Sequence, residues 1–309
     1  MEKDKQVLIT GAGGYLGLNL SASLVGQCRL RCLTRNSETL VSVLGETESV
    51  EIVQADLLNA GILEDALVGV DTVVHLAGMT SDSIPNQYML LRVNVDASWQ
   101  LAAAAQEAGV SQIIFPSTYH VYGRLRGREP RQVAETAGLS PASVYASSKA
   151  VAEMLFEHYS VPTAILRLSH IYGVGVGHRD WGGVLMALIR SALNEGVISL
   201  DEGAGDVRDY IHVNDVTVCL RRITLGSKSL KGVYNLGRGA SVTLLEMAEL
   251  IASGVQRVRG HKVEIQVPKF DSNGRASLDT SRIQAAIGFT SVHSPRDAID
   301  EMILRLGAE

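Results

Sequence analysis

A glycine-rich loop near the N-terminus constrains the fold of this chain more than any other feature. The loop, residues 11–17, follows the apolar run at residues 7–9 and opens a segment of helical periodicity. Glycine lets the backbone turn tightly and approach a pyrophosphate, and the N-terminus of the next helix offers unpaired amide donors. A strand, a glycine loop and a helix in this order predict a dinucleotide-binding unit. The loop residues expected to contact the cofactor are Gly11, Gly14, Tyr15, Leu16 and Gly17.

Short apolar runs alternate with helical segments along the first half of the chain. The apolar runs are residues 7–9, 30–34, 51–53, 72–76, 112–115 and 163–166, and the helical segments include 15–26, 87–108 and 145–159. Strands that alternate with helices of this length predict a parallel sheet, and helices on both faces explain why the strands are continuously apolar. We therefore expect an α/β fold, a Rossmann-type doubly wound parallel sheet with a smaller C-terminal substrate-binding lobe.

The alternation weakens after about Arg167, where glycine becomes frequent. We expect residues 1–168 to form the dinucleotide-binding domain, with later returns to the sheet near residues 207–237. Residues 169–309 should form mainly the substrate-binding lobe, with helices at 184–194, 244–254 and 298–306 and a strand at 233–236.

Composition limits the partners and the compartment. The 309 residues carry a formal net charge of −5, which provides no basic face for nucleic acid. The N-terminus lacks the apolar core of a signal peptide, and no segment reaches the roughly 18 apolar residues of a membrane span. Cys28, Cys32 and Cys219 have neither metal-binding nor CxxC spacing, which indicates buried thiols in a reducing compartment. We expect a cytoplasmic protein with no metal, nucleic-acid or membrane partner.

The end of the second predicted strand indicates which dinucleotide fits. Arg35 follows Thr34 at the place where a carboxylate would hold the ribose hydroxyls of NAD. A guanidinium can pair with a 2′-phosphate, so the sequence favours NADP, with NAD possible. The alternative for Arg35 is a solvent-facing loop residue. Asp56, after the third predicted strand, is placed to accept a hydrogen bond from adenine, or to cap a helix.

Tyr145 and Lys149 stand four residues apart, on one face of a predicted helix. A unit positive charge about 4 Å from a phenol stabilises the phenolate by on the order of 4 kcal/mol at an effective dielectric constant of about 20. This makes the tyrosinate accessible near neutral pH. A hydroxyl at Thr118, after the strand predicted at 112–115, can hold the reacting oxygen while Tyr145 moves its proton.

Taken together, these segments resemble the extended short-chain dehydrogenase/reductase family, in particular its nucleotide-sugar epimerase/dehydratase group. The resemblance extends over nearly the whole chain and rests on residues 10–17, 56–57, 75–78, 117–123, 145–149, 166–167 with 171–173, and 208–216. It implies a catalytic set of Thr118, Tyr145 and Lys149, in which Lys149 also binds the nicotinamide ribose. It further implies cofactor contacts from Asp56, Leu57, Leu76, Ala77, Gly78, Tyr145 and Lys149.

The same resemblance implies how substrate and a second subunit would bind. Arg208 falls at the family position that grips the diphosphate of a nucleotide sugar, and Arg275 resembles a second such position. The alternative for Arg208 is a structural ion pair with Asp209 or Asp215. The family also implies a homodimer packed through the helices around 87–108 and 145–159.

Two departures from the family narrow the expected chemistry. Dehydratases of this group carry Asp-Glu directly after the catalytic threonine, where this chain has Tyr119 and His120, so dehydration is disfavoured. His170 replaces the usual asparagine before the Tyr-Gly motif; it would bind the substrate or serve as an acid, or else be a structural residue.

The sequence therefore predicts an enzyme that transfers hydride at a ring carbon of a nucleoside-diphosphate sugar, with carbon 4 expected. The two specific alternatives are a 4-ketosugar reductase and a 4-epimerase. Arg35 favours the reductase, because the sugar 4-epimerases hold NAD tightly. The alternative from another class is a non-catalytic dinucleotide-sensing protein on the same fold, which the Tyr145–Lys149 pair disfavours.

Overall fold

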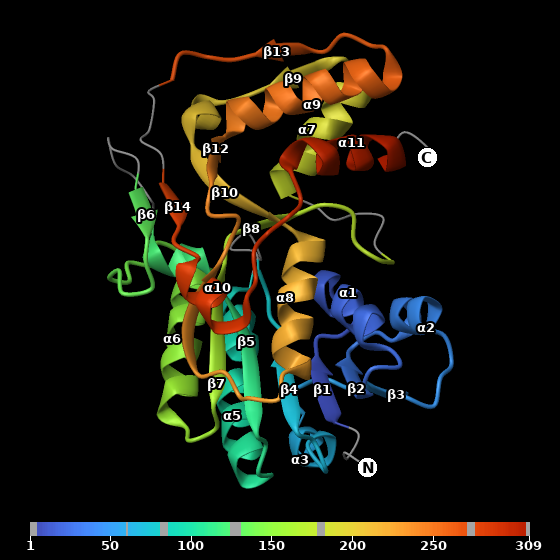
Figure 1. The fold of residues 1–309 in the computed structure, drawn as a ribbon, viewed down its shortest axis with the longest axis vertical. Coiled ribbons are helices and arrows are strands. Elements are labelled where there is room, and N and C mark those ends of the chain that lie inside the picture. The colour runs from blue at the N-terminus through green and yellow to red at the C-terminus, as the bar shows by residue number, and fades with distance from the viewer. Residues whose placement is uncertain are drawn as a thin grey trace.

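Seven parallel strands form the central sheet in the computed structural model, which describes residues 5–59, 61–80, 86–123, 131–177, 183–270 and 276–306 (Figure 1). The strands in chain order are β1 Gln6–Thr10, β2 Arg29–Thr34, β3 Val50–Gln54, β4 Thr72–His75, β5 Gln112–Thr118, β7 Thr163–Leu168 and β11 Gly232–Leu236. Their order in the sheet is β11-β7-β5-β4-β1-β2-β3, with β1 in the interior. This confirms the predicted doubly wound parallel sheet.

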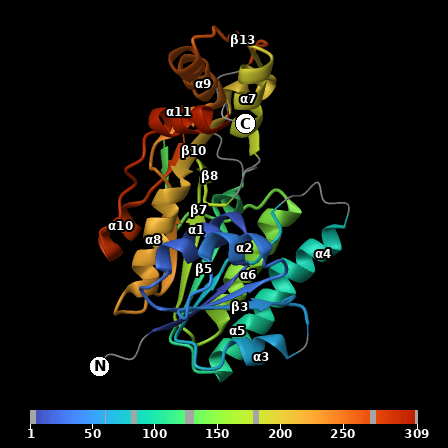
Figure 2. The same ribbon diagram turned by 90° about the vertical axis from the view of Figure 1, so that its right-hand side faces the viewer.

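Helices cover both faces of this sheet (Figure 2). On one face lie α1 Tyr15–Leu24, α2 Glu38–Leu44, α8 Val213–Leu225 and α10 Ser281–Ile287, and on the other lie α3 Ile62–Ala66, α5 Ala97–Glu107 and α6 Val144–His158. Alternate residues of one strand serve the two layers: Val7 and Ile9 pack on the first face, and Leu8 packs on the second. Burial on both sides explains the continuous apolar runs of the sequence.

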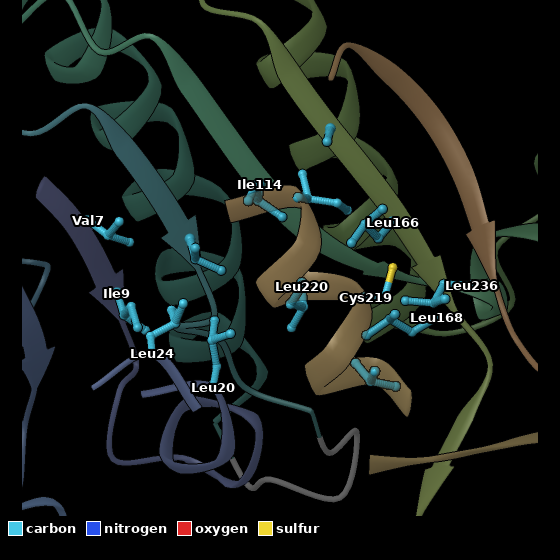
Figure 3. Packing of buried hydrophobic residues seen from close by; sticks show 14 of the residues in the cluster. Val7, Ile9, Leu20, Leu24, Ile114, Leu166, Leu168, Cys219, Leu220 and Leu236 are labelled. Atoms are coloured by element: carbon cyan, nitrogen blue, oxygen red, sulfur yellow. The ribbon is translucent and has the colours of Figure 1, made fainter. Parts of the chain in front are cut away.

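The first layer also contains buried sulfur. Cys219 and Leu220 of α8 pack against Leu166 and Leu168 of β7 and Leu236 of β11 (Figure 3). All three cysteines are buried free thiols. Burial raises the pKa of Cys28 and of Cys32 to about 11. The thiols therefore pack as small apolar groups, as predicted.

A second group of elements lies beyond the carboxyl ends of the strands (Figure 1). It comprises α7 Gly183–Asn194, β9 Val197–Ser199, α9 Leu244–Arg259, β13 Glu264–Gln266 and α11 Pro295–Leu306, which share their own apolar core. A three-stranded sheet of β8 His170–Tyr172, β10 Val207–His212 and β12 Ser241–Thr243 joins this group to the main sheet, and β6 Arg131–Val133 pairs with β14 Ala276–Leu278. No helix in the described residues has the length and apolar character needed to cross a membrane.

The largest departures from the predicted helix bounds are in the segment 87–108 and in α9. The segment 87–108 is divided into α4 Gln87–Leu91, a π-helical turn Arg92–Asp96 and α5. Helix α9 continues past Gly254 to Arg259, because Gly254 is a contact with α11 and not a stop. A Cβ at Gly254 would lie 2.7 Å from the side chain of Ile303. The helix ends instead at Gly260, which has a φ of 75° that suits glycine.

Candidate active site

A pocket of about 400 Å³ opens at the carboxyl ends of β1, β2, β3 and β4. Ligands of open parallel sheets bind at this edge, and the volume is typical of a cofactor site. The predicted cofactor residues that line it are Gly11, Gly14, Arg35, Asp56, Leu57, Leu76, Ala77 and Gly78. The lining residues that sequence reasoning missed are Gly13, Leu33, Thr34, Asn36, Thr39, Ala55, Leu58, Met79, Val93 and Ala97.

Two glycines of the loop are required by close backbone contacts. Gly11 has a φ of 68°, and a Cβ there would lie 2.6 Å from the backbone nitrogen of Ala77. At Gly17, a Cβ would clash with the carbonyl oxygen of Gly11. The first turn of α1 can therefore approach the loop closely. This packing leaves the helix N-terminus facing the pocket as an anion-binding end.

Three predicted cofactor residues of the loop make other contacts in the structure. The hydroxyl of Tyr15 donates to the carbonyl of Gly173 at 2.7 Å, which ties α1 to the loop after β8. Leu16 packs against the core, and Gly17 lies in the helix contact just described. None of these three residues lines the pocket of about 400 Å³, and Tyr15 instead borders a cavity of about 100 Å³ together with His170.

The side of the pocket expected to hold the adenosine contains Arg35 and Asp56. Arg35 is exposed and lines the pocket beside Thr34 and Asn36. Asp56 accepts a hydrogen bond from the backbone nitrogen of Leu58 at 2.9 Å, so its carboxylate stabilises the local turn. Asp56 therefore does not cap a helix, the alternative considered from sequence, because α3 begins only at Ile62.

Tyr145 and Lys149 lie on α6, which packs on β5, the strand next to β4 in the sheet. The hydroxyl of Ser143 caps the helix by accepting from the backbone nitrogen of Ala146 at 3.2 Å, which places Tyr145 in the first turn. Lys149 is 8% exposed, and its ammonium lies 3.9 Å from the centre of the Phe115 ring. Burial lowers the pKa of Lys149 to about 7, against the opposing charge of Glu153.

Thr118 is the last residue of β5 and is 6% exposed. Its Oγ1 accepts from the backbone nitrogen of His120 at 3.3 Å and so caps a 3-10 turn, Tyr119–Tyr122. An accepted bond leaves the hydroxyl hydrogen available to another acceptor. Since α6 packs on β5, the structure brings Thr118, Tyr145 and Lys149 to the same edge of the sheet.

A link between the pocket and the catalytic helix was not expected from sequence. Asn94, which is 2% exposed in the π-helical turn, donates from Nδ2 to the carbonyl of Met79 and to the hydroxyl of Ser148, both at 2.9 Å. Its Oδ1 accepts from the backbone nitrogen of Met79 at 2.8 Å. The irregular turn thus connects the pocket loop after β4 to α6, between Tyr145 and Lys149. Single π-turns within helices are frequent at functional sites.

His170 belongs to a polar aromatic face of β8 and β10. It pairs in register with Tyr210, and its Nε2 lies 3.0 Å from the hydroxyl of Tyr119. Burial lowers the pKa of His170 to about 3, with a further contribution from the charge of Arg208. The imidazole is therefore neutral, which disfavours the acid role considered from sequence. The side chain borders a cavity of about 100 Å³.

Arg208 lines a separate open pocket with Asp201, Glu202, Gly203 and Asp206. The carboxylates proposed as its alternative partners are held by other groups. Asp209 accepts from the backbone nitrogens of Arg238 and Gly239 at 2.9 and 3.0 Å, and Asp215 lies 2.8 Å from Nδ1 of His293.

Two further expectations concern Arg275 and metal ions. Arg275 lies outside the described residues. In the part of the chain that the structure describes, no three or more His, Cys, Asp or Glu side chains gather in a way that could hold a metal ion.

Comparison with known proteins gives a consistent set of matches. The model of the NAD dependent epimerase/dehydratase family matches residues 7–237. The chain is 25% identical to dTDP-L-rhamnose 4-epimerase from Burkholderia thailandensis over 294 aligned positions, which cover 81% of each chain. It is also 25% identical to a dTDP-glucose 4,6-dehydratase from Actinoplanes sp. over 319 positions, 96% of each chain. The structure of MoeE5 in complex with UDP-glucuronic acid and NAD is similar with a TM-score of 0.81, at 25% identity, covering 98% of this chain and 99% of that one.

Proposed function

Since the chain belongs to the NAD dependent epimerase/dehydratase family, we propose that it transfers hydride at a ring carbon of a nucleoside-diphosphate sugar, with carbon 4 as the reacting position. The observation that carries this proposal is the arrangement of side chains at the carboxyl end of β5. There the buried ammonium of Lys149 shares a helix face with Tyr145, and this helix packs on the strand that ends at Thr118.

The residues of the pocket fit a dinucleotide. Gly11 and Gly17 let backbone approach where a side chain would clash, and the pocket leads along the sheet edge from Arg35 towards β5. When bound there, the dinucleotide supplies the carrier of the hydride. Lys149 would bind the nicotinamide ribose, and the backbone of residues 14–17 the pyrophosphate.

The protein side chains would perform the proton transfer. Thr118 donates a hydrogen bond to the sugar oxygen and fixes its position, and Tyr145 takes the proton as the carbon is oxidised or returns it on reduction. The cation of Lys149 would stabilise the Tyr145 phenolate and so favour the base form. The buried ring of Phe115 keeps water from the ammonium.

We propose that the product is not a dehydrated sugar. Dehydration needs an acid and a base beside the catalytic hydroxyl, and Tyr119 is engaged with His170 instead. Burial raises the pKa of the Tyr119 phenol, which makes it a poor base. A 4-ketosugar reductase and a 4-epimerase therefore remain, and the exposed Arg35 favours NADP and the reductase.

We also propose the assignments that surround this chemistry. Arg208 and Arg275 hold the diphosphate, with His170 beside it as a neutral binding group. Residues 1–168, with later returns near 207–237, form the cofactor domain and 169–309 mainly the substrate lobe, in a cytoplasmic homodimer. The second candidate, a dinucleotide-sensing protein, is favoured by no observation in the structure.

One assay separates the two enzymatic alternatives. The protein is incubated with UDP- and dTDP-linked hexoses and their 4-keto forms, with and without NADPH. Steady loss of NADPH absorbance identifies a reductase, whereas isomer formation without added cofactor identifies an epimerase. Absence of both with every sugar would contradict the proposal.

Tyr145→Phe tests the mechanism in the same assay. We expect turnover to fall by about 10²–10⁴-fold, because general acid–base catalysis is lost while the ring remains. Dinucleotide affinity should change little. Tyr88→Phe, which removes a hydroxyl from an exposed tyrosine of α4, is the matched control and should retain full turnover. Unchanged turnover in Tyr145→Phe would show that the assigned base is wrong.

A further inference from the structure

Helix α6 carries a third polar residue at the spacing of the catalytic pair. Glu153 follows Lys149 by four residues, as Lys149 follows Tyr145, so all three lie along one face. Glu153 is 3% exposed. A carboxylate buried to this extent needs partners for both oxygens, since an unpaired buried charge is strongly unfavourable.

Two neighbouring strands supply those partners. Arg167 of β7 donates from Nη2 to Oε2 of Glu153 at 2.7 Å and from Nε to both oxygens at 3.2 and 3.1 Å. The hydroxyl of Ser117 on β5 donates to Oε1. Ser117 and Arg167 are register partners in the parallel pair of β5 and β7. One carboxylate therefore binds side chains from two adjacent strands at the same level.

This level adjoins the reacting residues. Ser117 immediately precedes Thr118, and Lys149 lies one helical turn from Glu153. The bonds of Glu153 thus fasten the helix that carries Tyr145 and Lys149 to the strand that carries Thr118. Without these hydrogen bonds, the hydroxyl of Thr118 and the phenol of Tyr145 could move relative to each other.

The charges around Lys149 give Glu153 a second effect. The described titratable or charged side chains around Lys149 and Glu153 are Tyr145 of α6, His75 of β4, Arg167 of β7 and Tyr122 of the 3-10 turn. His75 is neutral, because burial and the charge of Lys149 lower its pKa to about 3. Glu153 is therefore the anion that opposes the loss of the Lys149 proton.

We propose that Glu153 is a positioning residue, which holds α6 in register with β5 and keeps Lys149 protonated for its action on Tyr145. The inference rests on the proposed function for its catalytic meaning. The effect of the Glu153 charge on the protonation of Lys149 does not depend on the substrate.

Glu153→Gln separates charge from shape. Glutamine is nearly isosteric and can still accept from Ser117, but it carries no charge. We expect the Lys149 amine to titrate roughly one pH unit lower. The basic limb of the pH profile of kcat should move down by the same amount, so that kcat at pH 8 falls about tenfold. Glu157→Gln, which removes an exposed carboxylate one turn further along α6, should change neither quantity.

The titration is followed by nuclear magnetic resonance of the lysine side chains in the cofactor-free protein, with Lys149→Met to assign the signal. The same pKa of the Lys149 amine in Glu153→Gln, Glu157→Gln and the unaltered protein would overturn the inference. If the unaltered protein converts no nucleotide sugar, the proposed function fails, whereas the titration still tests Glu153.

A second variant covers the case in which Glu153→Gln does not fold. Glu153→Asp keeps the charge but withdraws it by one methylene group. This variant should lower the pKa of the Lys149 amine by less than Glu153→Gln does. It should also reduce kcat, without weakening dinucleotide binding. A Glu153→Asp protein with unaltered Lys149 titration and kcat would equally overturn the inference.

Discussion

At the scale of a single residue, the proposed cofactor preference rests on Arg35. Its side chain is exposed and lines the pocket beside Thr34 and Asn36, where a guanidinium could pair with a 2′-phosphate. We predict that Arg35→Ser weakens NADP binding by about 10–100-fold, the loss expected for one charge-assisted hydrogen bond, and leaves NAD affinity nearly unchanged. Fluorescence titration with both dinucleotides measures this.

Arg29→Ser is the control for the Arg35 substitution. Arg29 is also exposed, but it lies at the opposite end of β2 from the pocket. Its removal should leave both affinities unchanged. If the unaltered protein binds NAD as tightly as NADP, the preference inferred from Arg35 is wrong, and the epimerase becomes the better alternative.

Individual residues were predictable where a local pattern states their role. Gly11 and Gly17 follow from the turn and helix approach, and Tyr145 with Lys149 follows from helical spacing. Asn94 and Glu153 were not, because their partners lie far along the chain: Met79 and Ser148 for Asn94, and Ser117 and Arg167 for Glu153. A buried polar residue in a helix gives no sign in the sequence of which strand will satisfy it.

At the scale of elements, helices α4, α5 and α6 lie side by side (Figure 2), and each of them carries large apolar side chains that are exposed. The exposed large apolar side chains on these helices are Tyr88, Leu91, Trp99, Val151 and Met154, from 40% to 68% exposed. Trp99 is partly fixed, since its indole donates to the hydroxyl of Tyr159 at 2.7 Å. Apolar patches of this kind mark interfaces between proteins, which supports the proposed homodimer.

Charged residues in place of Trp99 and Met154, on the exposed side of α5 and α6, should weaken the proposed dimer. We predict that Trp99→Glu with Met154→Glu weakens self-association by at least about 30-fold, since buried tryptophans commonly contribute about 2 kcal/mol or more to an interface. Sedimentation velocity over a range of concentrations measures the change. Leu304→Glu, on the exposed side of α11, should leave association intact. A monomeric unaltered protein at every concentration would contradict the dimer.

Elements were predictable from sequence in proportion to their length and regularity. The strands β1 to β5 and helix α6 match their apolar runs and periodicity closely. The short strands β8 and β10 were not predicted, because three to six residues with mixed polar character give no distinct period. They carry His170 and Arg208, so the prediction that these residues bind the substrate rests on family resemblance and not on secondary structure.

At the scale of the whole molecule, two buried carboxylates connect the main sheet and its helices to the elements beyond the carboxyl ends of the strands. Asp209 of β10 accepts backbone bonds from Arg238, Gly239 and Leu278, which fixes the loops after β11 and at β14. Asp215 of α8 accepts from the hydroxyl of Ser291 at 2.5 Å and lies 2.8 Å from His293 Nδ1. The chain before α11 is thereby tied to a helix of the main sheet. The arrangement of these loops involves contacts between residues 29 to 78 positions apart, which composition and periodicity do not encode.

Asp215 makes the stability of this connection dependent on pH. Burial alone would raise its pKa, but hydrogen bonds from Ser291, His293 and Val292 outweigh that effect and lower it below the ordinary value of an aspartate. A group with a lowered pKa in the folded protein contributes stability above its unfolded pKa, near 4, and this contribution is lost as the pH falls through the folded pKa.

We therefore predict that Asp215→Asn destabilises the protein by about 2 kcal/mol near pH 7, where the unaltered side chain is a hydrogen-bonded anion. The difference should shrink as the pH falls from 5 towards 3, because protonation removes the same charge from the unaltered protein. Urea unfolding across this range measures both stabilities. Asp300→Asn, at the half-exposed ion pair of α11 with Arg257, should show a much smaller difference at every pH. A constant gap between Asp215→Asn and the unaltered protein from pH 7 to pH 3 would mean that its ionisation does not hold the two parts together.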